Sequence, residues 1–155
     1  MKKLIQIEVN GESHEVAVSP DQSLLFLLRD QLGLVSPKKG CDSGGCGCCT
    51  VEFNGRAIYS CMKYAVSTDG ASVTTVEGLA NNGELHPLQQ AFIDAGAVQC
   101  GYCTCGIMMA AKQLLTEIDD PDEQQIRHAI AGNLCRCTGY TKIVDAIKLA
   151  AEKRP

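Results

Sequence analysis

Ten cysteines fall into two groups of five, one in each half of this 155-residue chain. Four of the first group lie within the nine residues 41–49, and the second group spans residues 100–137. In a small secreted protein such a density indicates disulfides, but Gln6 and Glu8 interrupt the apolar run that a signal peptide needs. We therefore expect a cytoplasmic location, where clustered thiols hold metal more often than each other.

The first group has the spacing C-x4-C-x2-C at Cys41, Cys46 and Cys49, with Cys61 twelve residues further on. This is the plant-type ligand pattern for a 2Fe–2S cluster, in which four thiolates hold two irons. Glycines at 40, 44, 45 and 47 allow the positive φ values and close approach that a loop around an anionic centre requires. Cys48 is expected to point away from the cluster and to fill a small buried space.

Two other metal sites fit this first group less well. Zinc prefers paired C-x2-C knuckles, which a nine-residue glycine loop with a distant fourth cysteine does not supply. A Rieske centre needs two histidine ligands, and none of His14, His86 and His128 lies in a C-x-H pair.

The second group contains Cys100 and Cys103 as C-x2-C, and Cys135 and Cys137 as C-x-C, each pair in a turn predicted between two helices. Two helical hairpins that meet head to head would bring the four thiols together. Alone, such a set suits zinc or an iron–sulfur cluster; after a ferredoxin-like half, a second 2Fe–2S cluster is the better interpretation. Cys105 is either a competing ligand or, by preference, a free thiol whose pKa the helix dipole lowers.

Strand alternation followed by helical patterns predicts an α+β fold. Asn10-Gly11 and Asn54-Gly55 predict two hairpins, a helix is expected between Pro20 and Gly33, and residues 72–76 form a further strand. Later helices are predicted over residues 86–95, 106–117, 122–130 and 141–153. The expected domains are a plant-type ferredoxin-like β-grasp domain at 1–78, a linker at 79–84 and a four-helix bundle at 85–155.

The charge and the motif content of the chain argue against several classes of function. The 14 basic and 18 acidic residues give a net charge of −4 without a basic stripe, so nucleic acid is not an expected partner. No apolar stretch approaches the ~20 residues of a membrane span. No Ser/His/Asp set, phosphate loop or paired-carboxylate site stands out, and we expect no catalytic residue on this chain.

Three motifs carry a resemblance over the whole chain: GCDSGGCGCCTV at 40–51, GAVQCGYCTCG at 96–106 and GNLCRCTGY at 132–140. With them the chain resembles the small iron–sulfur subunit of the molybdenum hydroxylases, the family of xanthine dehydrogenase, aldehyde oxidoreductase and aerobic carbon monoxide dehydrogenase. The resemblance implies two 2Fe–2S clusters, a dimer of heterotrimers, and two partners, which are a large molybdopterin-binding subunit and an FAD-binding subunit. The implied ligands are Cys41, Cys46, Cys49 and Cys61 for one cluster and Cys100, Cys103, Cys135 and Cys137 for the other.

The resemblance also implies an order of electron transfer. Gln99 matches the family glutamine that contacts the pterin, and Cys137 matches the cluster ligand nearest to it. Electrons from substrate hydroxylation then pass through the helical-domain cluster and the ferredoxin-like cluster to FAD. The chain departs from the family at Cys48, usually alanine, and at Cys105, usually proline, and losing that proline frees a backbone N–H.

Two further functions stay open at this point. One is a free-standing ferredoxin-like electron carrier, for which a charge of −4 over 155 residues is weak support because carriers usually have a strong acidic excess. The other is a zinc-stabilised binding module without a redox role. The substrate is not encoded here, since the molybdenum subunit of the family binds it.

Overall fold

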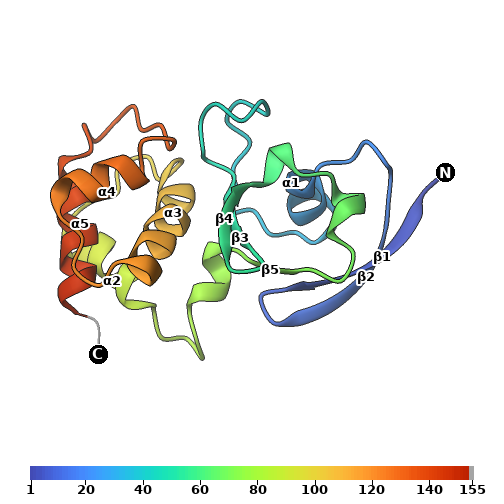
Figure 1. Cartoon of the computed structure of the whole chain (residues 1–155), viewed down its shortest axis with the longest axis horizontal. Coiled ribbons are helices and arrows are strands. Elements are labelled where there is room, and N and C mark those ends of the chain that lie inside the picture. Colours follow the sequence, from blue (N-terminus) through green and yellow to red (C-terminus); the bar gives the residue numbers. More distant parts are fainter. Residues whose placement is uncertain (154–155) are drawn as a thin grey trace.

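The computed structural model describes residues 1–153, in which a domain built on a sheet lies beside a domain of helices (Figure 1). The predicted α+β fold is confirmed. Residues 154–155, the end of the predicted helical domain, lie outside the described part. Within residues 1–153 no helix is both long and apolar enough to cross a membrane.

The sheet is mixed and five-stranded, in the order β2-β1-β5-β3-β4. β1 and β5 are parallel, and the other neighbours are antiparallel. The strand bounds are β1 (Lys3–Val9), β2 (Glu12–Val18), β3 (Thr50–Phe53), β4 (Arg56–Tyr59) and β5 (Ser72–Thr74). The last strand is shorter than the predicted 72–76, because a 3-10 turn, η4 (Val76–Leu79), begins there.

Both hairpins form at the Asn-Gly pairs, as predicted. Asn10 and Gly11 take φ values of 53° and 82°, and Asn54 and Gly55 take 47° and 80°. Two successive positive φ values are the geometry of a turn whose twist matches the flanking strands, and Asn-Gly reaches them at low cost. The alternating residues of β1 (Ile5, Ile7 and Val9) are buried in the core of this domain.

One helical segment covers the sheet. α1 (Leu24–Phe26) begins after Ser23, whose hydroxyl accepts a hydrogen bond from the Phe26 N–H at 3.2 Å. It continues as a π-helical stretch, η1 (Leu27–Gln31), rather than as the regular helix that leucine spacing predicts. Three leucines of this segment (Leu24, Leu27 and Leu28) are fully buried against the strands. Two 3-10 turns, η2 (Ser60–Met62) and η3 (Ala65–Thr68), follow β4.

Four helices make up the other domain, as predicted: α2 (Pro87–Asp94), α3 (Thr104–Glu117), α4 (Glu123–Ala129) and α5 (Thr141–Glu152). Capping boxes start two of them, one between His86 and Gln89 and one between Asp122 and Gln125. The buried faces of the four helices share one apolar core that includes Phe92. The C-x2-C pair lies between α2 and α3, and the C-x-C pair lies between α4 and α5.

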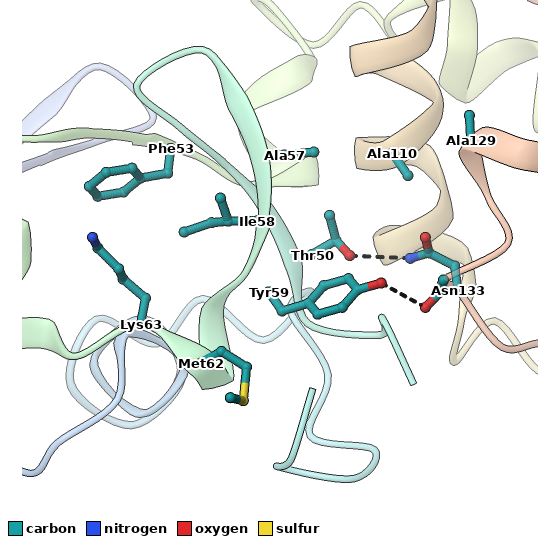
Figure 2. A pocket seen from close by; sticks show the side chains of 11 residues that line it. Thr50, Phe53, Ala57, Ile58, Tyr59, Met62, Lys63, Ala110, Ala129 and Asn133 are labelled. Atoms are coloured by element: carbon teal, nitrogen blue, oxygen red, sulfur yellow. Dashed lines mark hydrogen bonds between the residues drawn. The ribbon is translucent and has the colours of Figure 1, made fainter. Parts of the chain in front are cut away.

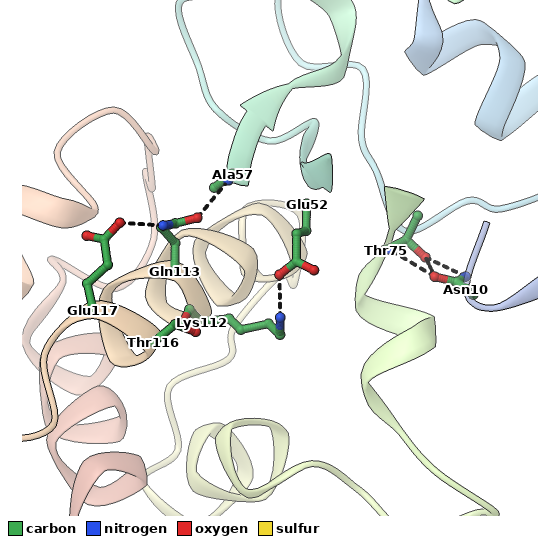
Figure 3. Close-up of polar contacts among 8 residues, drawn as sticks. All are labelled: Asn10, Glu52, Ala57, Thr75, Lys112, Gln113, Thr116 and Glu117. Carbon is green, nitrogen blue, oxygen red and sulfur yellow. Dashed lines mark hydrogen bonds and ion pairs between the residues drawn. The ribbon is translucent and has the colours of Figure 1, made fainter. Parts of the chain in front are cut away.

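The helical domain docks on the sheet through α3 (Figure 3). Lys112 forms an ion pair with Glu52 on β3, and the Gln113 side chain accepts a hydrogen bond of 3.0 Å from the Ala57 N–H on β4. Close backbone contact adds to these bonds, because a Cβ at Gly106 would lie only 2.3 Å from the Gly47 carbonyl oxygen. This contact places the start of α3 against the first cysteine loop. The second cysteine group therefore lies near the first.

Candidate iron–sulfur centres

The first cysteine loop, residues 40–49, is turned by residues with positive φ, among them Gly44 at 77° and Gly47 at 71°. These turns aim backbone N–H groups at a thiol sulfur: Ser43 N lies 3.4 Å and Gly45 N lies 3.2 Å from Cys41 Sγ. Hydrogen bonds with the Ser43 side chain and backbone, and then with the Cys46 thiol, lower the pKa of Cys41 to about 6. The loop therefore favours the thiolate at Cys41, which is the form that binds iron.

Cys49 of the first group is buried, and Cys61 is partly buried. The Ser60 hydroxyl donates to the Cys49 carbonyl oxygen at 2.7 Å and so holds the next residue, Cys61, beside it. Burial, together with the interaction with the Cys49 thiol, raises the pKa of Cys61 to about 11. The four thiols thus meet as two pairs, Cys41 with Cys46 and Cys49 with Cys61.

The second group is brought together by the two inter-helix turns, as the sequence predicted. Cys137 Sγ lies 3.5 Å from Cys100 Sγ on the exposed side, and the Cys135 and Cys103 thiols interact on the inner side. Burial is the main reason that the pKa of Cys103 rises to about 12. At Cys135 burial is outweighed by hydrogen bonds from the side chain and backbone of Thr138, which lower its pKa.

This pairwise arrangement bears on the metal that each group suits. All ten cysteines are free thiols. Among residues 1–153, no three His, Cys, Asp or Glu side chains are arranged to hold a single ion. A 2Fe–2S cluster takes four thiolates on two irons, so it needs pairs rather than one tetrahedral set. The donor sets of both groups therefore fit 2Fe–2S clusters.

A short segment between the helices joins the two cysteine groups. The Leu134 N–H donates to the Cys46 carbonyl oxygen at 2.9 Å, and Leu134 is the neighbour of Cys135. The buried Asn133 amide donates to the Gly47 carbonyl oxygen at 2.8 Å and to Thr50 Oγ1 at 3.2 Å. Figure 2 shows the Asn133 side chain reaching across to Thr50 on β3. Residues 132–135, which we call the bridge segment, thus hydrogen-bond directly to the first cysteine loop.

Beside the bridge segment lies a groove of about 550 Å³ between the β3–β4 hairpin and helices α3 and α4 (Figure 2). Tyr59 lines it and donates from its hydroxyl to the Gly132 carbonyl oxygen at 3.0 Å. The groove is open and contains none of the cysteines, so it is a seam between the domains rather than a cluster site.

The two surplus cysteines behave differently from each other. Cys48 is buried in the helical-domain core, as expected, and burial raises the pKa of its thiol to about 12. Its thiol nevertheless interacts with the Cys46 thiol, so the expectation that Cys48 points away from the ligand thiols is wrong. The expectation of a lowered pKa at Cys105 is wrong: its side chain packs against the helical core, and burial raises its pKa more than nearby Lys38 lowers it.

Gln99 and Cys137, the residues that the resemblance implies at the pterin, are both exposed. Gln99 precedes Cys100, whose sulfur is the one that lies against Cys137. The structure therefore places both on the outer rim of the second group.

Sequence reasoning missed Tyr140, which holds the second cysteine loop. It has an unusual positive φ of 69°, and its hydroxyl accepts from the Cys135 N–H at 2.8 Å and donates to the Asn133 carbonyl oxygen at 3.1 Å. Its place in the motif GNLCRCTGY was visible, but neither spacing nor residue type predicts such a strained clamp.

A small mixed-sheet domain and a helical bundle, each carrying four converging cysteines, define a two-domain 2Fe–2S protein. Comparison with known proteins agrees. The family described as 2Fe-2S iron-sulfur cluster binding domain matches residues 7–80, and the family described as 2Fe-2S binding domain matches residues 75–148.

Similar proteins cover nearly the whole chain. The nicotinate dehydrogenase small FeS subunit of Eubacterium barkeri is 47% identical over 98% of this chain and 97% of its own length. The nicotine 6-hydroxylase small subunit of Paenarthrobacter nicotinovorans is 45% identical over 92% of this chain and 86% of its own length. The crystal structure of quinoline 2-oxidoreductase from Pseudomonas putida 86 matches with a TM-score of 0.94 at 40% identity, over 97% of this chain and 94% of that one. The chain belongs to the small iron–sulfur subunits of the molybdenum hydroxylases.

Proposed function

We propose that this chain relays electrons between the molybdopterin centre and the FAD of a heteromeric molybdenum hydroxylase. The observation that carries the proposal is the convergence of eight thiols into two groups of four that the bridge segment connects. The proposed ligands are Cys41, Cys46, Cys49 and Cys61 in the first cluster and Cys100, Cys103, Cys135 and Cys137 in the second. Each cluster, when bound, accepts and passes on one electron at a time.

The chain's own residues hold, shield and connect the two clusters. Cys49 and Cys103 are buried and exclude water on the inner sides. The Ser43 and Gly45 N–H groups point at Cys41 and stabilise negative charge on its sulfur. The bond from Leu134 to the Cys46 carbonyl gives a short through-bond connection from one ligand residue to the neighbour of another.

The exposed ligands leave room for two partners. Cys100 and Cys137 are exposed on one domain and Cys41 on the other, so each cluster has an open side where a partner can approach. In the proposed assembly, Gln99 and Cys137 lie next to the molybdopterin of a large subunit. The first cluster faces an FAD-binding subunit, and the heterotrimer forms a dimer in the cytoplasm.

The same proposal includes the division of the chain. Residues 1–78 form the ferredoxin-like domain, residues 79–84 the linker and the following residues the helical domain. Two apolar cores support this division, one under the sheet and one among the helices, and Cys48 and Val76 of the first domain pack into the second core.

Paired variants of neighbouring cysteines test the ligand assignment. Cys49→Ala removes a proposed ligand, whereas Cys48→Ala removes the adjacent buried thiol. In chain purified anaerobically with its partners, C49A should lose one of two electron paramagnetic resonance (EPR) signals after dithionite reduction, and C48A should keep both. Equal spectra for the two variants would contradict the assignment.

Copurification distinguishes a relay subunit from a free-standing electron carrier and from a zinc-stabilised binding module. A tagged chain should leave the cell bound to much larger chains that contain molybdopterin and FAD. A red-brown chain that migrates alone at its 16.6 kDa would favour the free-standing carrier. A colourless protein that contains zinc would favour the binding module.

A further inference from the structure

Thr138 lies inside the second cysteine loop, between Cys137 and Gly139, and is half-buried. Its hydroxyl oxygen is 3.1 Å from Cys135 Sγ. The same oxygen accepts a hydrogen bond of 3.1 Å from the Tyr140 N–H. The hydroxyl is therefore in contact with one proposed ligand sulfur and with one backbone donor.

These two contacts fix the direction of the hydroxyl proton. A threonine hydroxyl has one proton to donate and lone pairs to accept with. The Tyr140 N–H occupies a lone pair, and a Cys135 thiolate has no proton to give. The proton of Thr138 consequently points at Cys135 Sγ.

Tyr140 keeps this geometry in place. Its hydroxyl binds the Cys135 N–H at 2.8 Å and the Asn133 carbonyl oxygen at 3.1 Å. Thr138 therefore contacts the Cys135 sulfur, and Tyr140 hydrogen-bonds to the Cys135 backbone. The Thr138 hydroxyl is a side-chain donor to this sulfur, beside the backbone N–H groups of Cys137 and Thr138 and the neighbouring Cys103 thiol, which is itself a proposed ligand.

A hydrogen bond to a cluster ligand has a defined effect on redox chemistry. The reduced cluster carries one more negative charge than the oxidised one, so a donor at a ligand sulfur stabilises the reduced form more. We propose that Thr138 is a positioning residue that raises the reduction potential of the helical-domain cluster through the Cys135 sulfur. This inference rests on the proposed function, in which Cys135 is a ligand.

The test uses Thr138→Val, which keeps the branched shape and removes the hydroxyl, and Thr138→Ser, which keeps the hydroxyl. Each variant is purified with its partner chains and titrated with dithionite under EPR. T138V should shift one of the two cluster signals to a lower midpoint potential and leave the other unchanged, while T138S should stay close to the unmodified chain. Thr116→Val is the control, because the Thr116 hydroxyl bonds the Lys112 carbonyl within α3.

Counts of iron and sulfide per chain show whether each variant still holds both clusters. T138V that retains four irons per chain and an unshifted potential would overturn the inference. Where valine itself disturbs the loop, Thr138→Ala should show the same shift. If valine and alanine both lose the cluster, Thr138 holds the loop instead of tuning it, and the inference fails. Two irons per unmodified chain would contradict the ligand assignment itself.

Discussion

The Leu134 N–H lies 2.9 Å from the Cys46 carbonyl oxygen and donates a hydrogen bond to it across the two domains. Cys46 belongs to the ferredoxin-like loop, and Leu134 precedes Cys135 in the helical domain. The bond from Asn133 to Gly47, two residues that are 86 positions apart in sequence, reinforces this link. The relative position of the two cysteine groups thus depends on the bridge segment and on the residues that hold it.

Asn133→Ala should weaken the docking of the two domains. The Asn133 amide is 3% exposed and donates to Gly47 and Thr50, so its removal costs about 1–3 kcal/mol in free energy of unfolding. Urea unfolding of the iron-loaded complex, followed by visible absorbance, measures the change. Gln124→Ala removes an exposed amide from α4 and serves as the control. Equal stability of the two variants would contradict a contribution of the bridge segment to the docking of the two domains.

Tyr140→Phe should release the second cluster faster than the first. The phenylalanine ring keeps the packing, but the bonds to the Cys135 N–H and the Asn133 carbonyl are lost, at about 1 kcal/mol each. Iron release to a chelator, with EPR identifying the cluster that disappears, measures the effect. Tyr59→Phe makes the same chemical change at a more exposed site and should have a smaller effect. A larger effect at Tyr59 would contradict the proposed clamp.

Gly106→Ala should separate the helical domain from the first cysteine loop. The added Cβ would lie 2.3 Å from the Gly47 carbonyl oxygen and 3.1 Å from Cys48 Cα, and backbone atoms cannot move aside as a flexible side chain does. We expect a loss of about 1–3 kcal/mol, measured by thermal unfolding of the complex. Thr116→Ala changes an exposed residue of the same helix and adds no atom against the loop, so it should be tolerated. Equal thermal stability of the two alanine variants would contradict close packing of α3 on the first cysteine loop.

Glu77→Gln should destabilise the chain by about 1 kcal/mol at neutral pH. Glu77 accepts hydrogen bonds from Ser36 and Thr75, and these outweigh its burial and hold its pKa below the ordinary 4.5. A depressed pKa contributes stability above the unfolded-state pKa, and that stability is lost as pH falls through the folded-state pKa. The loss in E77Q should therefore be the same at about pH 8 and about pH 6. A loss that varies between these values would mean that Glu77 titrates within that range.

Much of the fold could be predicted because local residues decide it. Asn-Gly pairs fix both hairpins, and Asp122 with Gln125 starts α4 where the capping pattern predicts. The α1 segment was less predictable: leucines at helical spacing do not distinguish a regular helix from the π-helical bond that Leu32 N–H makes to the Leu27 carbonyl at 3.1 Å.

The cysteines of the candidate site could also be predicted from the sequence, but the residues that hold them in place could not. The cysteine spacing indicated which thiols would converge, because the ligands of a 2Fe–2S cluster follow one another in the loops at typical intervals. It did not indicate Asn133, Thr138 or Tyr140, whose roles depend on how the two domains dock and on a positive φ at a tyrosine. Nor did it indicate that Cys105 is partly buried, since helix position alone says nothing about which side of α3 meets the core.

In the proposed function each half of the chain holds its own 2Fe–2S cluster. The most direct test is a count of iron and acid-labile sulfide per chain in protein purified without oxygen. We expect about four of each, the sum of two clusters with two irons and two sulfides apiece. About two of each would mean that one cysteine group does not assemble a cluster, and zinc without sulfide would contradict the redox role altogether.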